Sequence, residues 1–111
     1  MGAVAGDIDN DGNTDVYVAA MFSKAGSRVF GNLPPGAYSD EVHARLWRLV
    51  SGSELYRNRG DLRFEAQGVA QQVHAVGWAW GPALADFDND GWLDIYAPAG
   101  YISRERGKPD G

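Results

Sequence analysis

Cysteine is absent from the 111-residue sequence, which excludes disulfides and leaves the redox compartment open. No apolar run approaches the roughly 18 residues of a membrane-spanning helix. The arginines are scattered along the chain and do not form the basic patch that is typical of nucleic-acid-binding proteins. Serines are few, and none stands in a Gly-x-Ser-x-Gly elbow. The sequence therefore predicts no membrane span, no nucleic-acid partner and no catalytic residue.

The net charge of −5 conceals an uneven distribution. Eight of the fifteen acidic residues lie in two short stretches, and outside them seven acidic residues face ten lysines and arginines. The acidity is therefore local, and the remaining surface is expected to be mildly basic. Fifteen glycines together with four tryptophans and five tyrosines are typical of a β-rich protein with many tight turns.

The two acidic stretches share the pattern Asp-x-Asp-x-Asp-Gly-x-x-Asp, and they begin 79 residues apart. We call Asp7–Asp15 the first loop and Asp86–Asp94 the second loop. Carboxylates held close together repel one another, and a hard cation relieves the repulsion. Calcium takes 6–8 oxygen ligands at roughly 2.3–2.6 Å, and carboxylates, carbonyls and water supply them. The sequence thus predicts two calcium sites. The predicted ligands are Asp7, Asp9, Asp11, Asn13 and Asp15 in the first loop, and Asp86, Asp88, Asp90, the carbonyl of Trp92, and Asp94 in the second.

Neither loop fits an EF-hand. An EF-hand loop needs a glutamate at its twelfth position and a helix on each side. Val18 and Ala97 stand at the twelfth positions, and neither can bind a metal ion through its side chain. The residues that follow each loop are β-branched and aromatic, which predicts strands. Each loop is therefore expected to join two strands.

The first half of the chain has further local signals. Strands are expected at Ala3–Gly6 and Asp15–Ala20, on either side of the first loop. The stretch from Phe22 to Gly36 is rich in turn-forming residues and is expected to contain several turns. Ser39–Val50 begins with a capping residue and early acids, and its apolar residues recur at helical spacing. We predict a short amphipathic helix there.

A β-hairpin is expected next, with strands at Glu54–Asn58 and Leu62–Glu65. Its turn contains Arg59-Gly60-Asp61, the tripeptide that integrins recognise, but a tight turn explains these residues better. Trp78 and Trp80 alternate along the strand before the second loop, and buried core positions are favoured for the tryptophans over sugar stacking. The two histidines lack metal-ligand spacing and receive no role.

The motifs resemble the FG-GAP/VCBS repeats that form β-propeller blades. The similarity lies in Trp80–Gly91, and in Leu55–Asn58 followed by Phe64. The latter pairing is similar to the ASPIC/UnbV and cartilage-acidic-protein branch. The resemblance covers about residues 1–20 and 54–100, and it implies four-stranded blades with calcium in the loop between the first two strands.

The expected fold is therefore all-β, with one full propeller blade at residues 1–67, a helix inserted at about 39–50, and the start of a second blade at 68–100. Residues 101–111 are expected to be a polar, poorly ordered tail. A closed ring needs at least four blades. The chain is accordingly expected to be a fragment of a longer protein, or several copies are expected to assemble.

The expected function is calcium-stabilised, non-catalytic recognition or adhesion to a protein or a glycan. The resemblance implies an extracellular, periplasmic or cell-surface location, although Met1 leads directly into Gly2–Ala5 and the first loop without a signal-peptide pattern. Two alternatives stay open. Related propellers include enzymes that act on polysaccharides, and this chain would then carry part of such a blade set. The protein could also be a scaffold whose inserted helix, Ser39–Val50, docks a partner.

Overall fold

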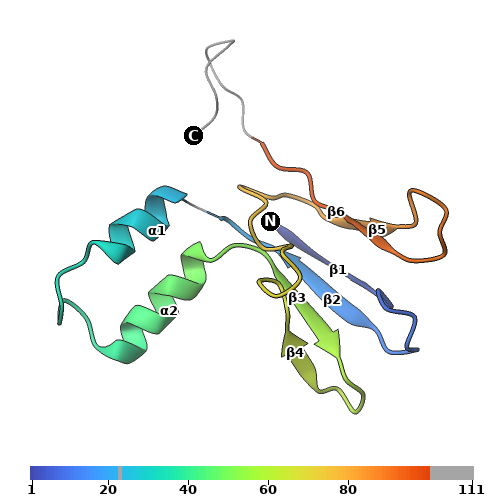
Figure 1. Cartoon of the computed structure of the whole chain (residues 1–111), viewed down its shortest axis with the longest axis horizontal. Coiled ribbons are helices and arrows are strands. Elements are labelled where there is room, and N and C mark those ends of the chain that lie inside the picture. Colours follow the sequence, from blue (N-terminus) through green and yellow to red (C-terminus); the bar gives the residue numbers. More distant parts are fainter. Residues whose placement is uncertain (23, 101–111) are drawn as a thin grey trace, which may run out of the picture.

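Two antiparallel sheets and two helices make up the computed structural model, which describes residues 1–22 and 24–100 (Figure 1). The elements are β1 (Gly2–Gly6), β2 (Asp15–Ala19), α1 (Lys24–Gly31), α2 (Asp40–Val50), β3 (Glu54–Asn58), β4 (Phe64–Ala66), β5 (Ala83–Ala85) and β6 (Asp94–Tyr96). The first four strands form one sheet in the order β1-β2-β3-β4, and β5 pairs with β6. The expectation of a mostly β architecture is confirmed. The predicted tail at 101–111 lies outside the described residues.

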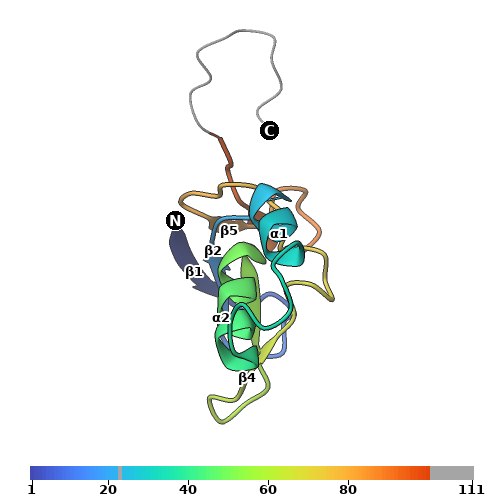
Figure 2. The same cartoon turned by 90° about the vertical axis from the view of Figure 1, so that its left-hand side faces the viewer.

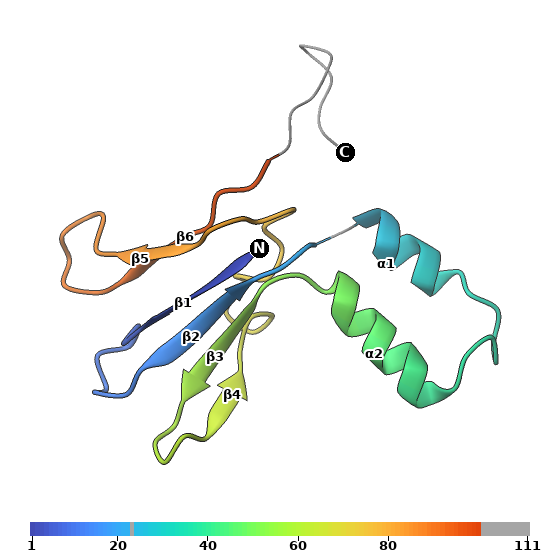
Figure 3. The same cartoon turned by 180° about the vertical axis from the view of Figure 1, so that it is seen from behind.

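The sheets and the helices occupy opposite ends of a flat molecule, whose extents are 46, 42 and 19 Å. The helical pair projects from the sheets, and both loops lie at the far end from it (Figure 1). The view along the sheets shows how narrow the arrangement is (Figure 2). The β5–β6 hairpin runs alongside β1, so the sheet pair continues past the edge of the larger sheet (Figure 3).

The core lies on one face of the four-stranded sheet. Along β2, burial alternates as expected for a strand with one covered face, and Asp15, Tyr17 and Ala19 are the buried residues. Tyr17 and Ala19 form the core cluster with Leu55 of β3 and with Ala79, which precedes β5. The alternation therefore directs the last acid of the first loop into the same interior as the core tyrosine.

The predicted helix at Ser39–Val50 is confirmed as α2. The side chain of Ser39 accepts a hydrogen bond from the backbone N–H of Val42, which caps the helix. The expectation of a turn-rich stretch from Phe22 to Gly36 missed a helix, because α1 occupies Lys24–Gly31. Gly26 weakens that helix locally, but α1 packs against α2 in a helical hairpin, and this long-range contact is invisible to a local reading.

The β3–β4 hairpin is confirmed with a shift at its second strand. Arg59-Gly60-Asp61 forms the turn as expected, and the backbone N–H of Arg59 donates to the carbonyl of Arg63 at 2.8 Å. The predicted strand at Leu62–Glu65 begins instead at Phe64, because Leu62 has a φ of 57° and belongs to the turn. Arg59 also hydrogen-bonds Glu65 at 2.6 Å, and this contact holds the pKa of Glu65 below its ordinary value.

The expectation that the tryptophans are buried in the core was wrong. All four are between 45% and 50% exposed. Trp47 lies on α2, which has no buried residue. Trp78 and Trp80 lie before β5, on a segment held by single bridges and not by a continuous sheet, and Trp92 lies in the second loop. Aromatic content predicts burial only where another layer covers the ring, and here none of the described residues does so fully.

Candidate metal centres

The first loop brings three carboxylates together. Oxygen atoms of Asp7, Asp9 and Asp15 all lie within 4.8 Å of one another. The hairpin register explains the proximity, because Gly6 of β1 pairs with Asp15 of β2, and the loop therefore starts and ends at the same edge. Three acids from one nine-residue segment thus face one small volume.

The backbone of the first loop winds around the carboxylate of Asp7. Its two oxygens accept hydrogen bonds from the N–H groups of Asp11 at 3.1 Å and Gly12 at 2.9 Å. The reversal requires left-handed conformations at Asn10, with a φ of 54°, and at Gly12, with a φ of 86°. Asparagine and glycine tolerate this region better than other residues, which explains their place in the motif.

The second loop repeats the same arrangement. Oxygen atoms of Asp86, Asp88 and Asp94 lie within 4.8 Å of one another. The carboxylate of Asp86 accepts the N–H groups of Asp90 at 3.0 Å and Gly91 at 2.8 Å. The left-handed residues are again the asparagine and the glycine, since Asn89 has a φ of 66° and Gly91 a φ of 90°. Two segments 79 residues apart therefore share one local geometry.

The closing acids of the two loops differ in their surroundings. Asp15 is fully buried, and its carboxylate accepts the N–H of Ile8 at 3.0 Å and the N–H of Asn58 at 2.8 Å. Asp94 is partly exposed, and it accepts the equivalent N–H of Phe87 at 2.9 Å. The additional hydrogen bond to Asp15 comes from β3, which pairs with β2 but has no counterpart beside β6 among the described residues.

The acid at the fifth position of each motif, Asp11 or Asp90, does not belong to the cluster of three carboxylates in its loop. Asp11 accepts the N–H of Asn13 at 2.8 Å, and Asp90 accepts the N–H of Trp92 at the same distance. The structure thus brings together the first, third and last predicted ligands of each loop. The remaining predicted ligands, Asp11, Asn13, Asp90 and Trp92, line the turn that leads to Asp15 and Asp94.

A protein-family model described as an FG-GAP-like repeat matches residues 7–97, from the first acid of the first loop to just beyond β6. The chain belongs to this family. No match was found among curated proteins or among solved structures. Within the described part of this FG-GAP-like repeat chain, no helix has the length and apolar character needed to cross a membrane.

Arg57 is the residue near the first loop that sequence reasoning missed. This β3 arginine forms an ion pair with Oδ2 of Asp9, and both side chains are 22% exposed. The other oxygen of Asp9 is buried and has no hydrogen-bond partner within the described structure. A buried carboxylate oxygen without a donor fits a cation, so this feature of the FG-GAP-like repeat agrees with a metal ligand at Asp9. The arginine lies 48 positions from Asp9, and no local pattern reveals the contact.

The two loops of the FG-GAP-like repeat chain lie side by side. The Asn10 side chain donates a hydrogen bond to the carbonyl of Gly91 at 3.1 Å and so joins the first loop to the second. A pocket of about 380 Å³ lies beside both loops. Its lining includes Asp9 of the first loop, Arg57 of β3 and Asp94 at the start of β6. The acidic centres are therefore neighbours that share one end of the molecule (Figure 3).

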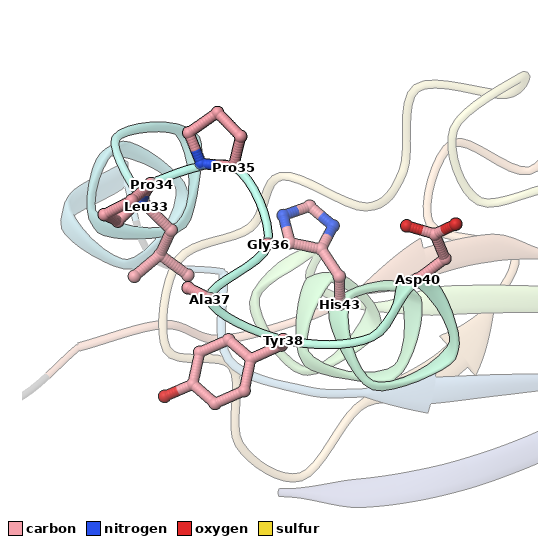
Figure 4. A pocket seen from close by; sticks show the side chains of 8 residues that line it. All are labelled: Leu33, Pro34, Pro35, Gly36, Ala37, Tyr38, Asp40 and His43. Atoms are coloured by element: carbon pink, nitrogen blue, oxygen red, sulfur yellow. The ribbon is translucent and has the colours of Figure 1, made fainter.

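A second hollow, of about 310 Å³, lies at the turn between α1 and α2 (Figure 4). Its lining includes one aspartate and one histidine, Asp40 and His43, and both lie at the start of α2. The hollow lies in the helical hairpin, at the opposite end of the molecule from the two loops (Figure 1). It therefore adds no residue to the candidate metal centres of the FG-GAP-like repeat.

Proposed function

We propose that this FG-GAP-like repeat chain is a calcium-binding, non-catalytic recognition module, and that it acts outside the cell, in the periplasm or at the cell surface. The observation that carries the proposal is the duplicated loop geometry. In each loop three carboxylates lie within 4.8 Å of one another around the same backbone reversal. The same arrangement in two loops of one chain suggests that both loops have the same role. Cation binding is such a role, because a cation relieves the repulsion among the carboxylates.

The chemistry of the donor atoms favours calcium over other metals. The motif offers oxygen ligands, whereas zinc and other transition metals prefer thiolate or imidazole ligands. Magnesium requires a near-ideal octahedron, while calcium accepts irregular sets of carboxylate, carbonyl and water oxygens. The turn residues Asn13 and Trp92 would contribute the less regular part of such a set. The predicted ligand sets thus suit calcium at both loops.

The proposed role of each ion is structural. Each loop joins two antiparallel strands, β1 to β2 and β5 to β6. An ion held by Asp7, Asp9 and Asp15 would join the end of β1 to the start of β2 and offset the repulsion among the acids. Ligand binding to the folded state stabilises that state by RT ln(1 + [L]/Kd). Calcium would therefore hold both hairpins closed.

The family relationship supports the recognition role, since FG-GAP repeats are typical of extracellular recognition and adhesion modules. We propose that the sheet β1-β2-β3-β4 is one propeller blade, within residues 1–67, and that β5 and β6 start another within 68–100. The antiparallel strand order supports this assignment. The four half-exposed tryptophans offer stacking surfaces for a glycan or a protein partner.

Terbium luminescence tests the proposal, because terbium replaces calcium and emits when a nearby tryptophan is excited. Trp92 lies in the second loop, whereas the first loop has Asn13 at that position. We expect calcium-displaceable terbium emission from the wild-type chain. The double variant Asp86→Asn, Asp88→Asn should lose most of it, while the matched variant Asp7→Asn, Asp9→Asn should retain it. Equal emission from all three proteins would rule out a metal site in the second loop.

A further inference from the structure

The contact between the first and second loops is part of a wider interface within the chain. A Cβ atom at Gly6 of β1 would lie 2.9 Å from Cδ1 of Leu84 and 3.0 Å from Cδ1 of Leu93. A Cβ at Gly2 would lie 3.2 Å from Cδ of Pro82. The larger sheet therefore presents glycines at its edge, and the larger side chains of the β5–β6 hairpin fill the space that the glycines leave.

The repeat of 79 residues gives every member of this interface a counterpart elsewhere in the chain. On the side of the larger sheet, the pairs are Asn10 with Asn89, Gly6 with Ala85, and Gly2 with Gly81. On the side of the hairpin, the pairs are Gly91 with Gly12, Leu84 with Ala5, Leu93 with Thr14, and Pro82 with Ala3. All these counterparts are exposed or partly exposed. A Cβ at Gly81 would meet no atom within 4 Å. The chain thus has an uncovered copy of each half of an interface that it also forms internally.

Two equivalent tyrosines show what the uncovered half lacks. Tyr17 of β2 is 0% exposed, and its hydroxyl donates to the carbonyl of Val73 at 2.9 Å. Ile95 and Ala97, from β6 and the segment after it, pack against the core that contains Tyr17. Tyr96, at the equivalent position of β6, is 56% exposed. The described residues leave Tyr96 without the cover that the second repeat gives to Tyr17.

The side chains that would cover Tyr96 are present elsewhere in the chain. The counterparts of Ile95 and Ala97 are Val16 and Val18 of β2, and both are partly exposed. Volumes also match across the uncovered halves. Where the internal interface sets Gly6 against two leucines, the uncovered one would set Ala85 against Ala5 and Thr14. Ala85 is larger than Gly6, whereas Ala5 and Thr14 are smaller than the two leucines, so the changes in volume offset each other, as close packing requires.

We propose that a second copy of this chain docks head-to-tail on the uncovered face of the β5–β6 hairpin. In this arrangement Asn89 donates to the Gly12 carbonyl of the second copy, as Asn10 donates to Gly91 within one chain. Val16 and Val18 of the second copy cover Tyr96. The contact joins two different surfaces, so each copy keeps one half free and the assembly grows into a ring or an open chain.

Association of this kind depends on calcium, and in this respect the inference rests on the proposed function. Docking places the four acids of one copy's second loop beside the four acids of the other copy's first loop. Bound cations offset the repulsion between them. Removal of calcium is therefore expected to dissociate the copies. Added salt in the absence of calcium should restore association only partly, because mobile salt ions screen the carboxylates less effectively than a cation bound between them.

Sedimentation velocity on the wild-type chain, with calcium and with chelator, tests the inference. We expect species larger than a dimer at high protein concentration in calcium, and a monomer in chelator. Asn89→Ala should weaken association about fivefold to tenfold, as expected for one lost hydrogen bond. Ala5→Gln, which adds a neutral side chain at an exposed site of β1, should weaken it more. Asn32→Ala removes an exposed amide outside both loops and should change nothing.

The same samples separate this inference from the proposed function. Calcium binding is measured on each variant by calorimetry at a concentration where all are monomeric, and circular dichroism checks that each is folded. A wild-type chain that binds calcium but stays monomeric overturns the docking inference and leaves the proposed function standing. Association that is equal in wild type, Asn89→Ala and Ala5→Gln overturns it as well. A chain that binds no calcium contradicts the proposed function itself.

Discussion

The first and second loops have the same carboxylate geometry but different surroundings. In both, the first acid accepts the N–H groups of the fifth and sixth residues, and the last acid accepts the N–H of the second. Among the described residues, only the first loop has a third strand beside it, and that strand covers Asp15 and donates the Asn58 N–H. The nine-residue motif therefore determines the shape of each loop, whereas neighbouring strands determine how deeply its acids are buried.

The two loops also differ in positive charge. Asp9 forms an ion pair with Arg57, while Asp88 is exposed and accepts the N–H of Asp90 at 3.2 Å. Among the ion pairs of the described residues, none involves an acid of the second loop. The positive charge of Arg57 therefore partly neutralises the first loop without a metal ion. We expect the second loop to depend more on a bound cation.

The largest difference is expected at the closing acids. Asp15→Asn replaces a buried acceptor of two backbone N–H groups, and one of these loses its partner. We expect the free energy of unfolding to fall by about 3 kcal/mol. Asp94→Asn, at a partly exposed site, should lower it by about 1 kcal/mol. Chemical denaturation without calcium measures both, and equal losses would mean that β3 contributes nothing special to the first loop.

Metal ligation and general acidity are separated in the second loop by neighbouring residues. Asp88→Asn removes one charged ligand and should weaken calcium binding there on the order of tenfold. Asn89→Asp adds an acid to the turn without adding a ligand and should change affinity little. Thermal melts with and without chelator, at low and high salt, report the calcium-dependent part of the stability. Equal and opposite shifts in the two variants would reduce the loop to an acidic patch.

The left-handed glycines should behave alike in the two loops. Gly12 and Gly91 have φ values of 86° and 90°, and a Cβ at either position would meet no atom within 4 Å. Gly12→Ala and Gly91→Ala therefore introduce backbone strain without a clash, and each should lower the free energy of unfolding by about 1 kcal/mol. A loss confined to one variant, measured by thermal unfolding in calcium, would show that the loops do not share one geometry.

The smallest effect is expected from Arg57→Gln. This change removes the positive charge beside Asp9, so the chain should lose about 0.5–1 kcal/mol of stability without calcium. The gain in stability on adding calcium should become larger at the first loop, because more carboxylate repulsion then remains for the ion to relieve. Arg63→Gln, on the same hairpin, serves as the control. A calcium increment that shrinks in Arg57→Gln would show instead that the arginine positions Asp9 for the ion.

Local sequence signals predicted the local features of this chain. The Asp-x-Asp-x-Asp-Gly motif located both loops, the Ser39 cap located α2, and the Gly60 turn located the β3–β4 hairpin. Features that depend on distant contacts were not predicted. The α1 helix packs against α2, and Asp9 of the first loop pairs with Arg57 of β3.

The tryptophans illustrate the same limit. Aromatic residues between turn signals suggested a covered core, but burial depends on which layers meet in space. Trp80 reaches the surface although its Nε1–H donates to the Gly100 carbonyl at 3.1 Å. The burial of Asp15 is the reverse case, because aspartates are rarely fully buried unless they are paired. Alternation along β2 indicates its inward direction, but only β3 completes its cover.

The central claim is that both loops bind calcium through the same arrangement of carboxylates. Isothermal titration of the metal-free wild-type chain with calcium, up to millimolar concentrations, tests it most directly, since extracellular modules bind at roughly 10⁻⁴–10⁻³ M. Two calcium ions per chain are expected to bind. The number should fall to one in the double variant Asp86→Asn, Asp88→Asn, and also to one in the double variant Asp7→Asn, Asp9→Asn. Binding of one ion or none by the folded wild-type chain would contradict it.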